Sequence, residues 1–410
     1  MRLPLAARLS SPAARTGLYY TSLFSTGAVA NPFLPIWLSD KGIDETYIGL
    51  VNAAPIFAMI ALNLIVGRIA DKANDWRSVI VFGSVFATVP PVLLLFSDGL
   101  WPILIIWTLV IVPFQAIAPI VDAATYRMSR RQSLNFGAIR VWGTLGFIVT
   151  TLIAGFVLDL EGAVAFVPLL IVVCAIRAVL SLQLPLFRGG EEAAHRPHYP
   201  IDAPISPLVA VRIGELWRPW FLLTMLGAAL LHASHMMQMA FGALIWAEAG
   251  LSGLTIGLLW ASAPAGEILA MLFFERLSKR FAARHIIFVA CVCGALRWFG
   301  MGLEPNVWVL LVLQLLHMAT MGLGFLGITN FIANWTTEDI AAEAQSFFVM
   351  IRQVVTVVAL LSFGVLAETF GAGGFYVAAA GSAVGAVLVV ASLRLMNPKY
   401  EQAELKGMIR

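Results

Sequence analysis

The stretch IGLVNAAPIFAMIALNLIVGR at residues 48–68 decides the fold, because a related stretch, IGLLWASAPAGEILAMLFFER, follows at residues 256–276. The two align without a gap at an offset of 256 − 48 = 208, and they share an Ile-Gly-Leu start, several apolar positions and a final arginine. Each copy is long and apolar enough to form a membrane-spanning helix that enters a basic turn. We therefore expect a chain made of two related halves.

The composition agrees with a helical membrane protein. Hydrophobic residues make up 60% of the chain and charged residues only 12%, against about 25% charged residues in soluble proteins. The net charge is +3, and no basic segment is interleaved with aromatic residues as a nucleic-acid partner would require. The three cysteines lie in apolar runs, and their odd number argues against a disulfide framework.

Apolar runs separated by charged or Gly/Pro breaks predict an all-α integral membrane protein with twelve transmembrane helices. The first run continues through Asn31 and Pro32 and is too long for a signal peptide, so we expect it to be retained. The expected spans are 17–38, 47–69, 77–97, 101–126, 134–158, 163–184, 219–246, 252–274, 284–303, 307–333, 342–366 and 372–395.

The loops between these spans alternate in charge. One set is rich in arginine and lysine, beginning with Arg15 and ending with Lys399, Lys406 and Arg410. The other set is almost purely acidic, with Lys41 as its one basic residue. The positive-inside rule then predicts a multi-pass protein of the cell (inner) membrane with both termini in the cytoplasm.

A polar segment divides the spans into six and six. It contains Gly189, Gly190, several charged residues and four prolines, which are typical of a linker. We expect an N-terminal six-helix bundle at 1–185, a cytoplasmic linker at 186–216 and a C-terminal six-helix bundle at 217–410. Internal repeats of this kind are common in secondary transporters, with the site near the midplane.

At this point the chain resembles the major facilitator superfamily. The turn after the second span carries Gly67, Asp71 and Lys72 in the spacing of that superfamily's G-x-x-x-D-[RK] loop, which implies a role in conformational change. Other stretches resemble the phenylpropionate permease branch and the related lactose permease, both proton symporters. These stretches are Phe33–Leu38, Asp122 with Arg140, Trp142–Phe147, His235–Trp246, Gly266–Leu269, Leu296–Gly300 and Leu315–Met318.

Five ionisable residues stand out inside long apolar runs, where a charge costs several kcal/mol unless it faces a partner or a cavity. They are Asp122, Arg140, Glu267, Arg297 and His317. The resemblance implies proton coupling by Glu267, His317 and Arg297, because these match the positions of the coupling residues in lactose permease. A static salt bridge between Glu267 and Arg297 is the alternative.

Five residues are candidates for substrate binding: Arg140, Asp122, Phe147, His235 and Gln314. An arginine fork beside aromatic rings suits a carboxylate attached to a ring. Gln314, His317 and Thr320 share one helix face at one-turn spacing. Arg352 also lies within a span. We expect it either to pair with a group on a neighbouring helix or to extend its charged end to the membrane surface.

These observations predict a secondary active transporter rather than an enzyme. We expect proton-coupled import of a small organic anion, such as an aromatic carboxylate, by alternating access, with the proton gradient in place of a cofactor. The partners are the small-molecule substrate and the lipid bilayer, and we expect a functional monomer. A proton-driven exporter of amphipathic compounds is an alternative, and a second is an intramembrane metal-dependent hydrolase that uses His232, His235 and Glu267.

Overall fold

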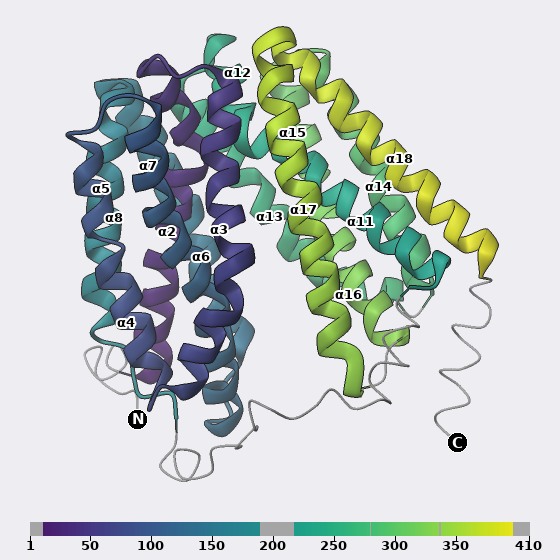
Figure 1. Cartoon of the computed structure of the whole chain (residues 1–410), viewed down its shortest axis with the longest axis horizontal. Helices are drawn as coiled ribbons and strands as arrows, with labels where there is room; N and C mark the ends of the chain where they lie inside the picture. The colour runs from purple at the N-terminus through teal and green to yellow at the C-terminus, as the bar shows by residue number, and fades with distance from the viewer. Residues whose placement is uncertain (1–10, 189–216, 279, 336–337, 397–410) are drawn as a thin grey trace. The chain divides into compact units, whose positions relative to one another are not determined.

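The computed structural model describes residues 11–188, 217–278, 280–335 and 338–396, and these form helices and short connections (Figure 1). The side chains of 61, 63–68, 70–71, 268–276 and 338–343 also lie outside the described part. The expected linker at 186–216 lies mostly outside it, as do the basic residues of the C-terminal tail.

Each of the twelve ranges that the sequence predicted is mainly helical, although some of them are divided into two or three helical segments. Eight described segments are long and apolar enough to cross a membrane, and one of these, Ala344–Leu395, includes two consecutive helices. The chain is therefore an all-helical membrane protein.

The first half contains the helices α2 (Pro12–Asp40), α3 (Glu45–Lys72), α4 (Trp76–Phe86), α5 (Val89–Leu94), α6 (Leu100–Arg131), α7 (Phe136–Glu161), η1 (Ala163–Ala165) and α8 (Phe166–Ser181). The second contains α11 (Pro219–Met237), η2 (Gln238–Gly242), α12 (Ala243–Glu248), α13 (Gly253–Ser278), α14 (Ala283–Gly302), α15 (Val307–Leu315), η3 (Met318–Leu323), α16 (Gly324–Trp335), α17 (Glu338–Phe370), η4 (Gly371–Gly373) and α18 (Gly374–Leu395).

Local sequence accounts for several boundaries. Ser11 caps α2, because its hydroxyl accepts a hydrogen bond from the Ala14 N–H, and Pro12 at the first helical position needs no donor partner. The expected span 77–97 is divided into α4 and α5 just before Pro90 and Pro91, which cannot donate the backbone hydrogen bonds of a continuous helix.

The contacts divide the chain into two compact units. Unit 1 comprises Met1–His198 with Gly242–Ala261, and unit 2 comprises Tyr199–Phe241 with Ser262–Arg410. The grouping of α12 and the first turns of α13 with unit 1 follows from their packing. Gly253 and Leu254 donate backbone hydrogen bonds to the Asp159 carboxylate at the end of α7.

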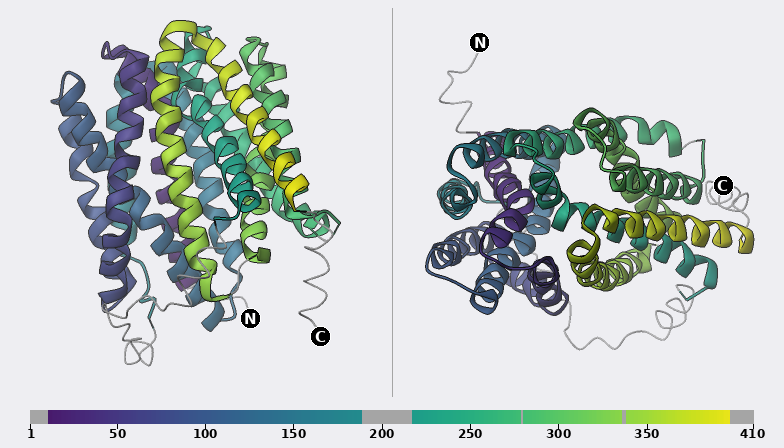
Figure 2. Two further views of the ribbon diagram at one scale, coloured as in Figure 1. Left: turned by 45° about the vertical axis from the view of Figure 1, so that its right-hand side comes forward. Right: turned by 90° about the horizontal axis from the view of Figure 1, so that it is seen from above.

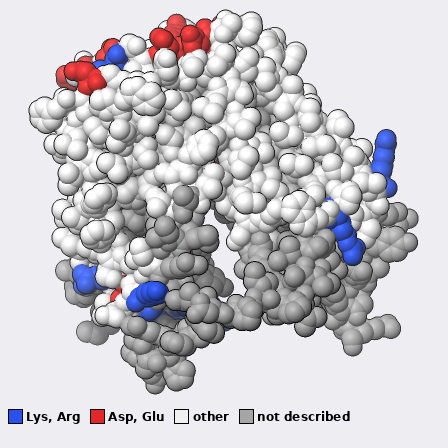
Figure 3. Space-filling view, in the orientation of Figure 1, with Lys and Arg blue, Asp and Glu red and all other residues white. Residues whose placement is uncertain are grey.

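Each unit has its own apolar core between helices that run side by side (Figure 2). Tyr19, Tyr20 and Ile80 lie in the core of unit 1, and Phe221, Ile287 and Phe331 lie in the core of unit 2. On the visible face of unit 1, acidic side chains gather at one end and basic ones at the other (Figure 3). The uncharged surface between them is what a bilayer-spanning bundle requires.

Candidate functional site

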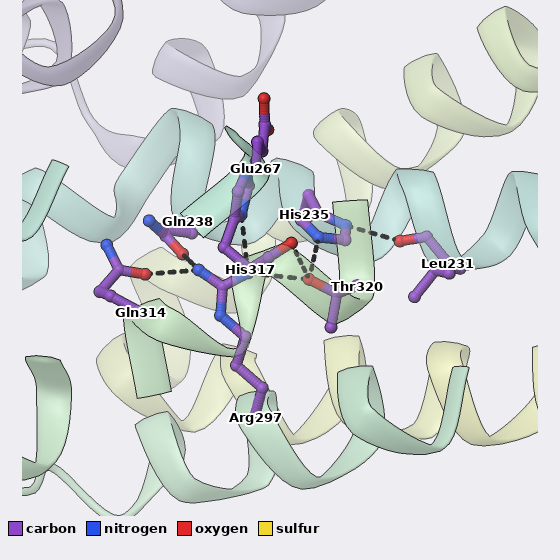
Figure 4. Close-up of polar contacts among 8 residues, drawn as sticks. All are labelled: Leu231, His235, Gln238, Glu267, Arg297, Gln314, His317 and Thr320. Carbon is purple, nitrogen blue, oxygen red and sulfur yellow. Dashed lines mark hydrogen bonds and ion pairs between the residues drawn. The ribbon is translucent and has the colours of Figure 1, made fainter. Parts of the chain in front are cut away.

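Arg297 is the centre of a buried polar network in unit 2. It lies on α14 with no exposed surface, and its two terminal nitrogens donate four hydrogen bonds. Nη1 contacts His317 Nδ1 at 3.0 Å and Thr320 Oγ1 at 3.2 Å. Nη2 contacts the side-chain oxygens of Gln238, at 2.7 Å, and Gln314 (Figure 4). The guanidinium is thus held from three other helical segments at once.

Two π-helical turns supply part of this network. Gln238 begins the π-turn η2 after α11, and Thr320 lies in the π-turn η3, which starts directly after His317. A π-turn inserts one extra residue into a helix and is frequent at functional sites. Gln314, His317 and Thr320, which the sequence placed on one helix face, all accept hydrogen bonds from the Arg297 guanidinium.

The hydrogen bonds define the state of His317. Arginine cannot accept a hydrogen bond, so His317 Nδ1 is the acceptor and its ring proton lies on Nε2. Nε2 then donates to Glu267 Oε1 at 2.9 Å. One third of the Glu267 side chain is accessible, against 12% for His317. The carboxylate is therefore the exposed end of a chain that begins at the buried guanidinium.

A second chain of hydrogen bonds runs from Arg297 to His235. His235 Nδ1 donates to the Leu231 carbonyl at 2.8 Å, which leaves Nε2 to accept from Thr320 Oγ1 at 2.9 Å. The His235 ring packs edge-on against Trp298, whose indole N–H donates to Ser234. Both histidines are thereby oriented in their neutral forms by the same arginine.

Glu267 and Arg297 do not form the direct salt bridge that was the alternative expectation. His317 lies between the two residues and bonds to both. Among the described residues, no carboxylate lies within 4 Å of Arg297. The reason is geometric, because the glutamine, threonine and histidine acceptors occupy all four Nη hydrogens.

A second group of candidate residues lies in unit 1. Arg140 Nε on α7 bonds to Asp122 Oδ1 on α6 at 3.1 Å, and the Tyr20 hydroxyl donates to the same oxygen at 2.6 Å. The guanidinium also lies 4.2 Å from the Phe24 ring centroid. About one third of the Arg140 side chain is accessible, and its Nη groups make no hydrogen bond to the described residues.

Tyr20 and Phe24 are site residues that sequence reasoning missed. They lie four residues apart on α2, so both point to one side of that helix. Their i, i+4 spacing can be seen in the sequence, but the sequence does not show which helix these two side chains face. By contrast, Phe147 is half-buried on α7 and makes no ring contact with this group. Of the predicted loop motif, Lys72 is exposed at the end of α3, and the side chains of Gly67 and Asp71 lie outside the described part.

This fold has solved counterparts. The nucleoside transporter NupG matches the structure with a TM-score of 0.79 over 93% of this chain and 99% of its own, at 15% identity. At this identity the likeness shows the fold, a helical membrane bundle of the kind that NupG has.

The chain belongs to the MFS_1 like family, whose model matches residues 15–358. It is 25% identical to a probable 3-phenylpropionic acid transporter of Escherichia coli, over 88% of this chain and 92% of that protein. It is 24% identical to the maltose permease of Geobacillus stearothermophilus, over 80% and 81%. This is a family of transporters, so the chain is a permease rather than an enzyme, and the hydrolase alternative is set aside.

Proposed function

We propose that this transporter imports a small organic anion of the aromatic carboxylate class together with a proton. The observation that carries the proposal is the Arg140 group. A guanidinium with unoccupied Nη donors can receive a carboxylate as a fork, and the Phe24 and Tyr20 rings beside it offer an apolar wall to an attached ring. The similarity to a probable phenylpropionic acid transporter supports the same class.

The proton is assigned to the Glu267–His317 pair. Glu267 is the accessible acid of unit 2, and His317 joins it to a fixed positive charge. Protonation of Glu267 removes its charge while its hydrogen bond from His317 can persist.

The architecture that goes with this function has twelve spans in two six-helix bundles, at 1–185 and 217–410. Both termini are assigned to the cytoplasm, and the protein to the cell membrane as a functional monomer. The two bundles would expose the site alternately to each side. The alternation of basic and acidic loops supports this orientation.

The test is uptake of labelled 3-phenylpropionate into proteoliposomes under an inward proton gradient, with protein-free liposomes as the baseline for passive entry. We expect the gradient to raise the initial rate for the wild type. Glu267→Gln should lose this stimulation but keep exchange of labelled for unlabelled substrate. Glu368→Gln, which neutralises an exposed acid at the end of α17, is the matched control and should behave as the wild type.

Two outcomes would count against the proposal. Gradient-stimulated uptake that survives in Glu267→Gln would remove the proton from this residue. If proton entry stimulates only the efflux of substrate and not its uptake, the exporter is favoured.

A further inference from the structure

A small cavity in unit 2 is lined by two basic side chains that the transport mechanism above does not use. His232 of α11 and Arg352 of α17 face a space of about 20 Å³, together with Thr320, Phe325 and Phe348. A cavity holds a water-sized group when roughly 10–15 Å³ is open to it. This one has room for a single small ion or one carboxylate group.

Neither basic group has a partner among the described residues. Neither Arg352 nor His232 forms a hydrogen bond or ion pair with any described residue. Arg297, by comparison, has all four Nη hydrogens occupied. A guanidinium within a membrane span is costly when its charge is unmatched, so an unpartnered one beside a cavity indicates a ligand that supplies the missing negative charge.

Charge accounting leads to the same residue. Asp122 balances Arg140 in unit 1, and Glu267 balances Arg297 through His317 in unit 2. Arg352 has no such acid among the described residues. Arg177 also lacks one, but it is fully enclosed and directed at Thr26 and Cys174. Among the described residues, Arg352 is therefore an uncompensated charge with a cavity in front of it.

The duplication adds an independent argument. The offset of 208 maps Phe24 onto 24 + 208 = 232, which is His232, and Arg140 onto 140 + 208 = 348, one helical turn before Arg352. In unit 1, Arg140 lies against the Phe24 ring. In unit 2, Arg352 on the corresponding helix lines the same cavity as His232, whose imidazole, unlike a phenyl ring, can donate a hydrogen bond.

We propose that His232 and Arg352 form an anion site in unit 2 that binds one small monovalent anion, such as a carboxylate group or a halide. Arg352 supplies the charge and His232 an N–H donor. The anion is either free in solution or the carboxylate of the transported substrate. The site does not require the proposed transport function, because the binding of free formate or chloride can be measured on the protein alone.

The experiment is a thermal-unfolding titration of the purified full-length protein in detergent. Sodium formate or sodium chloride replaces sodium isethionate at constant ionic strength, because the isethionate sulfonate is too bulky for the cavity. An anion that binds the folded state raises the midpoint temperature as its concentration rises. We expect this rise for the wild type. Arg352→Gln should weaken the apparent affinity by about tenfold or more, since a charge-assisted hydrogen bond is lost.

Matched variants separate the site from general charge effects. Arg394→Gln removes an exposed arginine from the last turn of α18 in the same unit and should titrate as the wild type. His232→Gln, which retains a donor, should bind more weakly than the wild type but more tightly than His232→Leu. This histidine pair keeps the test decisive if Arg352→Gln fails to fold. An unchanged titration in Arg352→Gln, equal affinities in the two histidine variants, or no response in the wild type would overturn the proposal.

A competition arm identifies the source of the anion. If chloride weakens the stabilisation by 3-phenylpropionate, and Arg352→Gln removes both effects, the site takes the substrate's carboxylate. If the two ligands stabilise additively, the site takes a free inorganic anion. A failure of proton-driven uptake with the formate response intact would reject the proposed transport function and leave this site standing.

Discussion

At the scale of single residues, the chemistry of Arg297 is decided by the acceptors around it. Four neutral side chains accept its Nη hydrogens, and its Nε has no partner among the described residues. Low polarity around a buried arginine strengthens each of these bonds and raises the cost of losing one. The network is therefore sensitive to the removal of a single oxygen.

Thr320 provides the clearest case, because its hydroxyl joins Arg297 to His235. Thr320→Val keeps the shape but leaves one guanidinium hydrogen and His235 Nε2 unpaired. We expect it to lower the free energy of unfolding by about 1–2 kcal/mol. Thr320→Ser retains the hydroxyl and should lose clearly less. Thermal unfolding in detergent measures both, and equal losses would show that the methyl contact matters rather than the hydrogen bonds.

The residues of this network were predictable in part. Glu267, Arg297 and His317 stand out in a sequence of apolar spans, because isolated ionisable residues there need partners. The order of the contacts was not predictable. Nothing in the sequence places His317 between Glu267 and Arg297, since that depends on how three helices are rotated about their axes.

At the scale of elements, the twelve apolar ranges predicted the helices well, because a long apolar run leaves the backbone few alternatives in lipid. The two π-turns could not be predicted. The run from Leu315 to Leu323 reads as a regular helix, yet η3 begins directly after His317 and sets the direction of Thr320. The extra residue has no local sequence signal and is stabilised by the tertiary contacts it makes.

The packing of α7 against α13 gives a prediction at the same scale. Gly257 lies so close to α7 that an added Cβ would be 2.8 Å from the Thr151 carbonyl oxygen. Gly257→Ala must push backbone atoms apart, and we expect a loss of about 1–3 kcal/mol in thermal unfolding. At Gly381 on α18 no atom lies within 4 Å of the added methyl group. Gly381→Ala should therefore be neutral or stabilising by up to about 1 kcal/mol.

Equal effects of the two alanine substitutions would contradict this account of the α7–α13 contact. They would mean that the close approach of Gly257 to α7 adds no cost to the helix-propensity effect, which is the same at both sites. Asp159→Asn tests the other component of the contact. It removes the negative charge of the carboxylate that accepts hydrogen bonds from the Gly253 and Leu254 N–H groups at the start of α13. The free energy of unfolding should fall by up to about 1 kcal/mol.

At the scale of the whole molecule, the separation of charge along the helices predicts how the protein crosses the membrane. Helix α7 has 26 residues, so it is about 39 Å long and exceeds a hydrocarbon core of roughly 30 Å. Gln132 precedes it next to a basic turn, and Glu161 ends it among acidic residues; both are exposed. The positive-inside rule predicts that Gln132 faces the cytoplasm and that Glu161 faces the outside.

Cysteine labelling in intact cells measures this orientation. The three natural cysteines are first replaced by serine or alanine, whose side chains are similarly small. Cys174 and Cys291 are buried and Cys293 is half-buried. Glu161→Cys should then react with a membrane-impermeant maleimide added outside, and Gln132→Cys should react only after the membrane is permeabilised. Because the two positions flank one helix, the reverse pattern would invert the whole assignment, and labelling of both from outside would mean that α7 does not span the bilayer.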